Sequence, residues 1–194
     1  MAGVEMETEI EARISKLQKQ GKLHALRHIS RIGRITYNAL RYTGDNIIKK
    51  EVIARFLTAE NEAVNNAKSL AINRENYKFK YKGLAERDGR RVYVFDVRPN
   101  KKKVGLFKGE LWIDPSSYCA VREAGTLVKS PSVFLKKVQF VRSYQIQDGA
   151  ALLSRVDTVI DTRLIGRAEL SVTYSDYRRV DEEKVTAAGA SENQ

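Results

Sequence analysis

The feature that most constrains the fold of this chain is an alternation of apolar and polar residues with a period of two, which recurs from Phe107 to Tyr177 between short turn signals. Its last segment, residues 164–177, has the pattern of a half-buried antiparallel strand, with small or apolar residues on one face and polar residues on the other. The apolar-face positions are Leu164, Gly166, Ala168, Leu170, Val172 and Tyr174. The pattern predicts a large antiparallel sheet with one dry face.

The first residues show the same strict alternation, because Val4, Met6 and the even-numbered positions up to Ile14 face one side of residues 4–14. Lys19-Gln20-Gly21 is expected to be a turn, and Asp88-Gly89 a hairpin turn. Further strands are predicted over residues 23–29, 34–41, 77–82, 91–98, 106–114, 118–123, 134–146 and 152–162.

One segment has helical spacing instead. From Asn46 to Leu70 the period becomes that of a helix, and Asp45 is placed to cap its first turn. The stripe that we expect to be buried is Ile48, Val52, Phe56, Ala59, Ala63, Ala67 and Leu70. Such a stripe must pack against something, and the sheet is the only large apolar surface that the sequence predicts.

These elements define the predicted fold class: mainly β (α+β), with an antiparallel, incomplete β-barrel, or half-barrel, curled over one long α-helix. About ten short strands are more than a flat open sheet holds without curling. We expect residues 1–179 to form a single domain, since 194 residues bury a substantial core. The composition of residues 180–194 is typical of a disordered tail.

Charge gives the main clue to a partner. The 35 Lys and Arg against 24 Asp and Glu leave a net charge of +11, which favours an anionic partner such as nucleic acid, an anionic membrane surface or an acidic protein. No window approaches the about 18 to 20 consecutive apolar residues of a membrane span, and no export signal is recognisable at the N-terminus.

Residues that could carry chemistry do not form a catalytic or metal-binding pattern. His24 and His28 have a spacing that suits a metal only on a helix, and in a strand they are roughly 13 Å apart. Asp157 and Asp161 are separated by a similar distance, too far for paired acid and base. The single cysteine, Cys119, has no local activating base and is expected to be a small apolar residue in a strand. We therefore expect no enzyme activity, no catalytic residues, no metal and no cofactor.

Basic residues gather in several places, including residues 16–55, Lys101 to Lys103 with Lys108, and Lys129 with Lys136 and Lys137. They could contact phosphates of nucleic acid or lipid headgroups, or simply form a solvated face. Tyr77, Phe79 and Tyr81 alternate with lysines as in a base-stacking strand, but in a half-barrel such aromatic residues are expected to be core.

Taken in order, six segments of the chain resemble the outer-membrane lipoprotein-sorting proteins, the LolA/LolB-like group, and a bacterial branch of it in particular. They are KKEVIARFLTAENEA, NYKFKYKG, DGRRVYVFDVRP, GLFKGELWIDP, VREAGTLVKSPSVFLKKVQFVRSY and GRAELSVTYSDY. The resemblance covers roughly residues 30–178. It implies an open β-barrel over helices, with a hydrophobic cavity that shelters lipid acyl chains in the periplasm or at the outer membrane.

The resemblance leads to a functional expectation: a non-enzymatic periplasmic or envelope carrier or accessory protein, whose signal peptide has been removed, binding an acyl chain or lipoprotein and meeting anionic headgroups with a basic rim. A basic nucleic-acid-binding module and a ligand-free envelope scaffold are the alternatives, with nucleic acid the less favoured partner. The expected cavity-lining residues are Ile53, Phe56, Leu57, Phe79, Leu111, Ile113, Val138, Phe140, Leu170 and Val172.

Overall fold

All ten strands of the computed structural model, which describes residues 3–87, 89–164 and 166–180, belong to one antiparallel sheet. The strands are β1 (Gly3–Ile14), β2 (Lys19–Ile29), β3 (Ile35–Gly44), β4 (Tyr77–Arg87), β5 (Arg90–Pro99), β6 (Phe107–Ile113), β7 (Ala120–Leu127), β8 (Leu135–Gln147), β9 (Ala150–Thr162) and β10 (Arg167–Val180). Their order is β3-β2-β1-β10-β9-β8-β7-β6-β5-β4, so β3 and β4 are the two edges.

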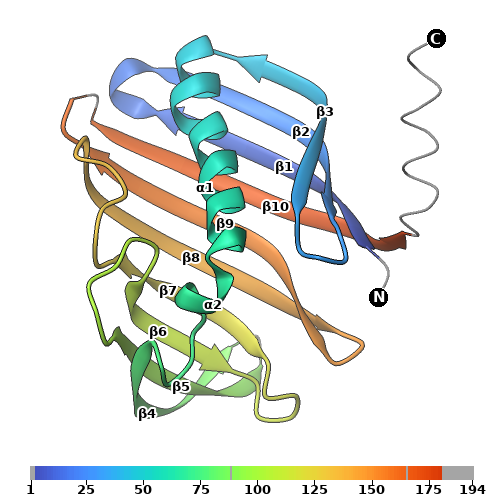
Figure 1. Ribbon diagram of the computed structural model, residues 1–194, viewed down its shortest axis with the longest axis vertical. Helices are drawn as coiled ribbons and strands as arrows, with labels where there is room; N and C mark the ends of the chain where they lie inside the picture. The colour runs from blue at the N-terminus through green and yellow to red at the C-terminus, as the bar shows by residue number, and fades with distance from the viewer. Residues whose placement is uncertain (1–2, 88, 165, 181–194) are drawn as a thin grey trace.

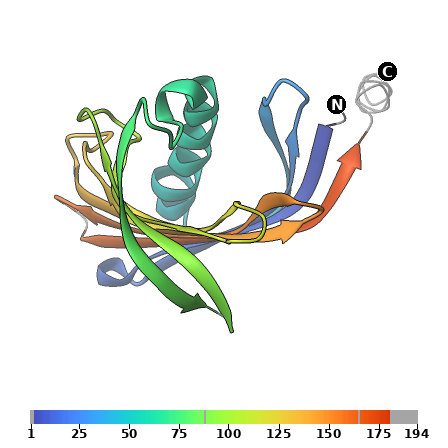
Figure 2. The same ribbon diagram turned by 90° about the horizontal axis from the view of Figure 1, so that it is seen from below.

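The sheet curls into an open trough, and the helical segment lies along its concave side (Figures 1 and 2). This segment comprises a π-helical stretch η2 (Ile48–Ile53), helix α1 (Ala54–Asn65) and the short helix α2 (Ala67–Leu70). It connects β3 to β4, the two edges of the sheet. The predicted half-barrel over a helix is therefore confirmed.

The predicted strand faces at the N-terminus and C-terminus are confirmed as well. Met6, Ile10 and Ile14 of β1 have no exposed surface, and neither has Val172 of β10. The two strands are direct neighbours, with Ile10 opposite Val172. Because both strands alternate with a period of two, one register brings all their apolar side chains to the concave face.

The helix begins as predicted. The Asp45 carboxylate accepts a hydrogen bond from the backbone N–H of Ile47 at 2.7 Å, and Lys19 pairs with it at 3.1 Å. These contacts, the Lys19 hydrogen bond first, lower the pKa of Asp45. Gly44 enters this turn with φ of +94°, and a side chain there would lie 2.4 Å from the carbonyl oxygen of Gln20. The sequence thus fixes the start of the helix tightly against β2.

The predicted helical stripe is correct only in its first turns. Ile48, Val52 and Ile53 are buried, but Ala59, Ala63 and Ala67 are exposed. Two causes are visible: the π-helical turn shifts the angular phase of everything after it, and the continuous helix ends at Asn65, before the predicted Leu70. The face of α1 that turns to the sheet carries Phe56, as predicted, together with Leu57, Glu60 and Asn61, which were not part of the stripe.

Helix α1 is attached to the sheet by a polar network. Glu60 accepts hydrogen bonds from Arg27 of β2 at 2.9 Å, from the Tyr37 hydroxyl of β3, and from the Tyr174 hydroxyl of β10 at 3.3 Å. Arg27 also lies over the Tyr174 ring, 5.1 Å from its centre. Burial, and then the charge of Glu60, raise the pKa of both tyrosines, so their hydroxyls remain proton donors. One carboxylate therefore joins the helix to three strands.

Smaller predictions are corrected. The first turn lies at Ser15–Leu17 and Gln18, so Lys19 to Gly21 already belong to β2. Strand β10 begins at Arg167, and Leu164 is exposed in the loop before it. Cys119 lies in the turn before β7 rather than in a strand. Of the predicted tail, Val180 is the last residue of β10, and residues 181–194 lie outside the described residues, as does Asp88.

Candidate functional site: an open aromatic groove

The concave face has a second half, formed by β4 to β8, whose apolar cluster packs against α2 and the loop after it rather than against η2 and α1 (Figure 1). Pairing across these strands sets which side chains point into it. Tyr81 lies opposite Phe95, and Phe95 opposite Leu111. Since directly paired residues of antiparallel strands share a face, the three form an inward-facing row.

A groove of about 460 Å³ lies on this half of the face. It is lined by Asn73, Arg74, Phe79, Phe95, Leu111 and Ile113. Phe79 is 38% exposed and the adjoining Tyr81 is 52% exposed, although both occupy inward positions. The expectation that these aromatic residues form core is therefore wrong for Phe79 and Tyr81, because β4 is an edge strand that the helix does not reach. Tyr77, nearer the start of β4, is buried.

Two of the six residues that line the groove are aromatic, and further rings pack beside them. The ring of Tyr81 lies 5.4 Å from that of Phe95 and 6.1 Å from that of Tyr93, measured between centres. On the same face of the sheet, Phe107 of β6 packs edge-on against Phe140 of β8 at 4.9 Å. Offset and edge-on ring contacts of this kind are favourable and rigid, so the apolar wall is preformed.

A glycine makes the contact between the Phe107 and Phe140 rings possible. A side chain at Gly125 of β7 would lie 2.5 Å from the Phe107 ring. Gly125 is paired with Phe140, so its missing side chain leaves the room in which the two rings meet.

The remaining groove wall is a loop, residues 71–76, held by amide side chains. Asn76 donates from its Nδ2 to the carbonyl oxygens of Lys68 at 3.2 Å and Ala71 at 2.9 Å. Asn100 donates to the carbonyl oxygen of Glu75 at 3.0 Å. These bonds fix Asn73 and Arg74 beside the groove, which gives an apolar groove one polar and basic border.

A charged pair interrupts the apolar concave face at the inner side of the groove. Arg142 of β8 donates from Nη1 to Oε2 of Glu123 on β7 at 3.1 Å, and the Tyr144 hydroxyl donates to Oε1 at 2.8 Å. Burial, followed by the charge of Glu123, raises the pKa of Tyr144, so the hydroxyl stays protonated. The Glu123 side chain is 9% exposed, whereas that of Arg142 is 44% exposed.

The structure does not bring the ten expected cavity-lining residues together in one cavity. Ile53, Leu170 and Val172 belong to the packed core under the helix, with Phe56 and Leu57 against its edge. Phe140 is buried in the second cluster, and Val138 is half-buried. Only Phe79, Leu111 and Ile113 line the groove.

Five residues at this site were not predicted: Asn73, Arg74, Phe95, Glu123 and Arg142. Phe95 follows from the alternation of β5 once its partner Leu111 is known. Glu123 and Arg142 could have been noticed in the sequence. Each is a charged residue at a position where the apolar and polar alternation of its strand predicts an inward-facing side chain. Asn73 and Arg74 lie in a loop, where no periodicity helps.

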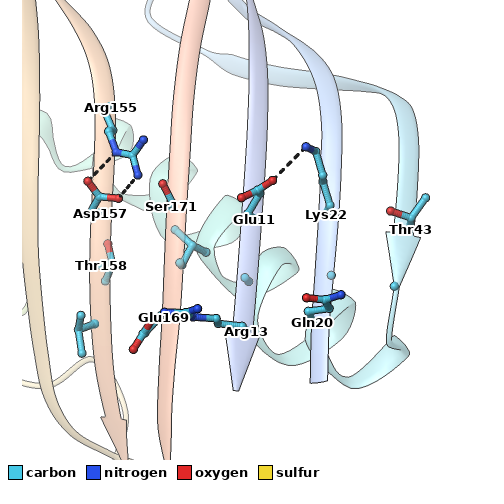
Figure 3. Close-up of a pocket in the computed structure, with 15 residues that line it drawn as sticks. Glu11, Arg13, Gln20, Lys22, Thr43, Arg155, Asp157, Thr158, Glu169 and Ser171 are labelled. Carbon is cyan, nitrogen blue, oxygen red and sulfur yellow. Dashed lines mark hydrogen bonds and ion pairs between the residues drawn. The ribbon is translucent and has the colours of Figure 1, made fainter. Parts of the chain in front are cut away.

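A larger hollow of about 700 Å³ lies on the convex face, over β1, β2, β3, β9 and β10 (Figure 3). Its charged side chains are paired with one another: Arg13 with Glu169 at 2.7 Å, Lys22 with Glu11 at 3.0 Å, and Arg155 with Asp157 at 2.7 Å. The hydrogen bond from Arg155 lowers the pKa of Asp157. With its charges mutually neutralised, this hollow is the solvated back of the twisted sheet.

Of the other residues tested for chemistry, His24 and Asp161 lie on β2 and β9, strands that do not line the groove. Asp161 lies 4.0 Å from Arg167, and His24 lies 3.3 Å from Glu7. Within residues 3–87, 89–164 and 166–180, no group of three or more His, Cys, Asp or Glu is arranged to hold a metal ion. Nor does any helix in the described part of the chain have the length and apolar character needed to cross a membrane.

No family model matches the sequence, and neither does any curated protein. Solved structures do resemble it. A DUF1329 family protein from Desulfovibrio piger is 9% identical, with a TM-score of 0.45, over 92% of this chain and 85% of the other. A LolA superfamily protein from Nitrosomonas europaea is 11% identical, with a TM-score of 0.41, over 95% and 89%.

A third structure is described as an outer membrane lipoprotein-sorting protein domain and comes from Vibrio parahaemolyticus. It is 10% identical, with a TM-score of 0.41, over 94% of this chain and 88% of the other. The second and third structures bear the name of the group that the sequence motifs resemble. No residue role is transferred from them at these identities.

Proposed function

We propose that this protein is a non-enzymatic carrier or accessory protein of the bacterial envelope, periplasmic or associated with the outer membrane, and that it holds an acyl chain, free or attached to a lipoprotein, in the aromatic groove. The observation that carries the proposal is the exposure of inward-facing Phe79 and Tyr81 beside a groove of about 460 Å³. Apolar side chains left uncovered on a concave surface mark binding sites.

The energetics favour an acyl chain as the occupant. Each CH₂ group that leaves water contributes about 0.8 kcal/mol, and the groove offers ring faces and aliphatic side chains from Phe79, Phe95, Leu111 and Ile113. The wall is preformed by ring packing, so little ordering cost opposes binding.

The basic rim is the second part of the proposal. Lys101 to Lys103 lie in the loop between β5 and β6, and Lys129 lies in the loop after β7. The two loops are at the same end of the sheet, because the N–H of Val128, just after β7, bonds to the carbonyl oxygen of Leu106, just before β6. Exposed Val133 and Phe134 stand in the adjacent loop. Lysines beside exposed apolar side chains suit a surface of anionic lipid headgroups.

Nucleic-acid binding is less well supported. The lysines of β4, including Lys78 and Lys80, alternate with Phe79 and Tyr81, so the two sets project from opposite faces of the strand. A base stacked on these rings would therefore not have its phosphate beside these lysines. Lys82 is moreover paired with Glu110 at 2.6 Å.

The test is a displacement titration with a fluorescent fatty acid, combined with mass spectrometry for co-purified lipid. Phe79→Glu is expected to weaken probe binding about tenfold or more, because a charge would enter the apolar groove. Ile32→Glu, at an exposed position in the β2–β3 turn, makes the same change elsewhere and should bind normally. Sedimentation with anionic and neutral vesicles tests the rim, and only anionic vesicles should retain the protein.

The alternatives give different outcomes. A protein that carries no lipid and ignores the probe would be a scaffold without a ligand. If it also binds oligonucleotides with an affinity that falls steeply as salt increases, the hypothesis of a nucleic-acid-binding module replaces that of a carrier.

A further inference from the structure

One row of inward-facing side chains connects the groove to the charged pair. Leu111 of β6 lies opposite Glu123 of β7, and Glu123 lies opposite Arg142 of β8. Neighbouring strands are about 4.8 Å apart, so the pair begins one strand beyond the groove wall. An acyl chain in the groove would therefore have its head within reach of these two residues.

The two members of the pair differ in how fully their polar atoms are used. Both carboxylate oxygens of Glu123 are occupied, one by Arg142 and the other by the Tyr144 hydroxyl. The guanidinium of Arg142 lies over the Phe140 ring, 4.7 Å from its centre. This arrangement holds the Arg142 side chain on the floor of the concave face.

Arg142 keeps donors that a ligand can use. A guanidinium has five N–H groups; Arg142 uses one on Glu123 and also interacts with the Tyr144 hydroxyl, which leaves donors over. The Arg142 side chain is 44% exposed, so a ligand on the concave side can contact it. Beside an apolar groove, the remaining N–H groups are strong donors within reach of an acceptor oxygen on a bound lipid, in addition to those of Arg74 in the groove wall.

The charge of Glu123 determines which acceptor fits. Its carboxylate lies 3.1 Å from the guanidinium and cancels most of the positive charge there. The carboxylate of a free fatty acid would approach Glu123 as a like charge, which is unfavourable in a partly buried site. The carbonyl oxygen of an ester or amide is neutral and accepts the same hydrogen bond without this repulsion.

We propose that Arg142 is a ligand-binding residue that donates a hydrogen bond to the ester or amide carbonyl at the head of a bound acyl chain, and that Glu123 discriminates against free carboxylates. This inference rests on the proposed function. It assigns the ligand class: chains linked through an ester or amide, as in acylglycerols and acylated proteins.

The experiment compares three competitors of similar chain length, delivered from cyclodextrin, against a fluorescent alkyl probe: methyl laurate, lauric acid and tridecane. In the unchanged protein, methyl laurate should displace the probe about tenfold more strongly than tridecane, the effect of one hydrogen bond to a charged donor. Arg142→Met should abolish that difference while leaving tridecane binding unchanged. The matched control is Arg122→Met, which removes an arginine stacked on Trp112 on the opposite face of the sheet.

Glu123→Gln provides the sharper arm, because it keeps Arg142 and removes only the negative charge. Lauric acid should then bind about tenfold better than it does to the unchanged protein and should equal or exceed the methyl ester. A variant damaged merely in folding would lose all three competitors together. If Arg142→Met fails to fold because Glu123 is left as an unpaired charge, the double variant Arg142→Met with Glu123→Met replaces it; it removes both charges together, and the preference for the ester should be lost there too.

The outcomes separate the two proposals. If all three competitors bind but the ester is not preferred, or if Glu123→Gln does not shift the preference to the acid, the role of the pair is wrong and the acyl-chain carrier stands. If no competitor displaces the probe from the unchanged protein, both proposals fail.

Discussion

The covered and open halves of the concave face are built from strands of the same kind, yet their side chains have different surroundings. In the covered half, Ile10 and Val172 are fully buried under η2. In the open half, Phe95 occupies an equivalent inward position and is half-buried, and Phe79 is exposed. The comparison teaches that alternation determines which face a residue occupies, while the path of a single helix determines whether that face becomes core or binding surface.

The covered half should therefore be the part that stabilises the fold. Ile10→Ala is expected to lower the free energy of unfolding by about 3 kcal/mol, because it removes a fully buried side chain and leaves a cavity. Urea unfolding measures the loss, and Ile32→Ala, the same change at an exposed position, should cost almost nothing. If Ile10→Ala lowered the free energy of unfolding by less than about 1 kcal/mol, the covered half would not be the part that stabilises the fold.

The attachment of α1 separates the two halves, and Glu60 is its main contact. Glu60→Gln should lower the free energy of unfolding by about 2 kcal/mol, since Arg27 would stay buried without its counterion. Faster hydrogen exchange confined to residues 54–65 would show that the helix has loosened from the sheet. Glu62→Gln, an exposed change on the same helix, is the control, and equal exchange in both variants would contradict the role of Glu60.

The open half should contribute least to stability. Phe79→Ala is expected to lower the free energy of unfolding by less than about 1 kcal/mol, because the ring is already partly in water on an edge strand. The same variant should bind an acyl probe more weakly. A large loss of stability with unchanged probe binding would reverse the comparison and make Phe79 a core residue.

The strands and their faces could be predicted because burial on one side of a sheet imposes a period of two that is plain in β1 and β10. The helix could be predicted as an element, and its cap at Asp45 as well, because both depend on nearby residues. Its later stripe could not, since the π-helical turn changes the phase after Ile53 and a contact from Arg27, far away in sequence, selects the face that carries Glu60.

The candidate site was harder to predict than the fold. The resemblance gave apolar residues at inward positions, and three of them, Phe79, Leu111 and Ile113, line the groove. To separate these three residues from core residues such as Ile53 and Val172, one must know which part of the sheet the helix covers. No local sequence pattern gives that information. The pairing of Glu123 with Arg142 depends on the register of β7 and β8, which a sequence does not state.

The connection between the sheet edges has a mechanical meaning. Strands β3 and β4 are the two ends of a ten-stranded ribbon, and residues 45–76 run between them along the hollow side. Because this connection is joined to both edge strands, its length limits how far the two edges of the sheet can move apart. The width of the trough that is available to a ligand therefore depends partly on the number of residues between Asn66 and Asn76. Insertions or deletions there would change this width without changing the apolar side chains of the sheet that a ligand contacts.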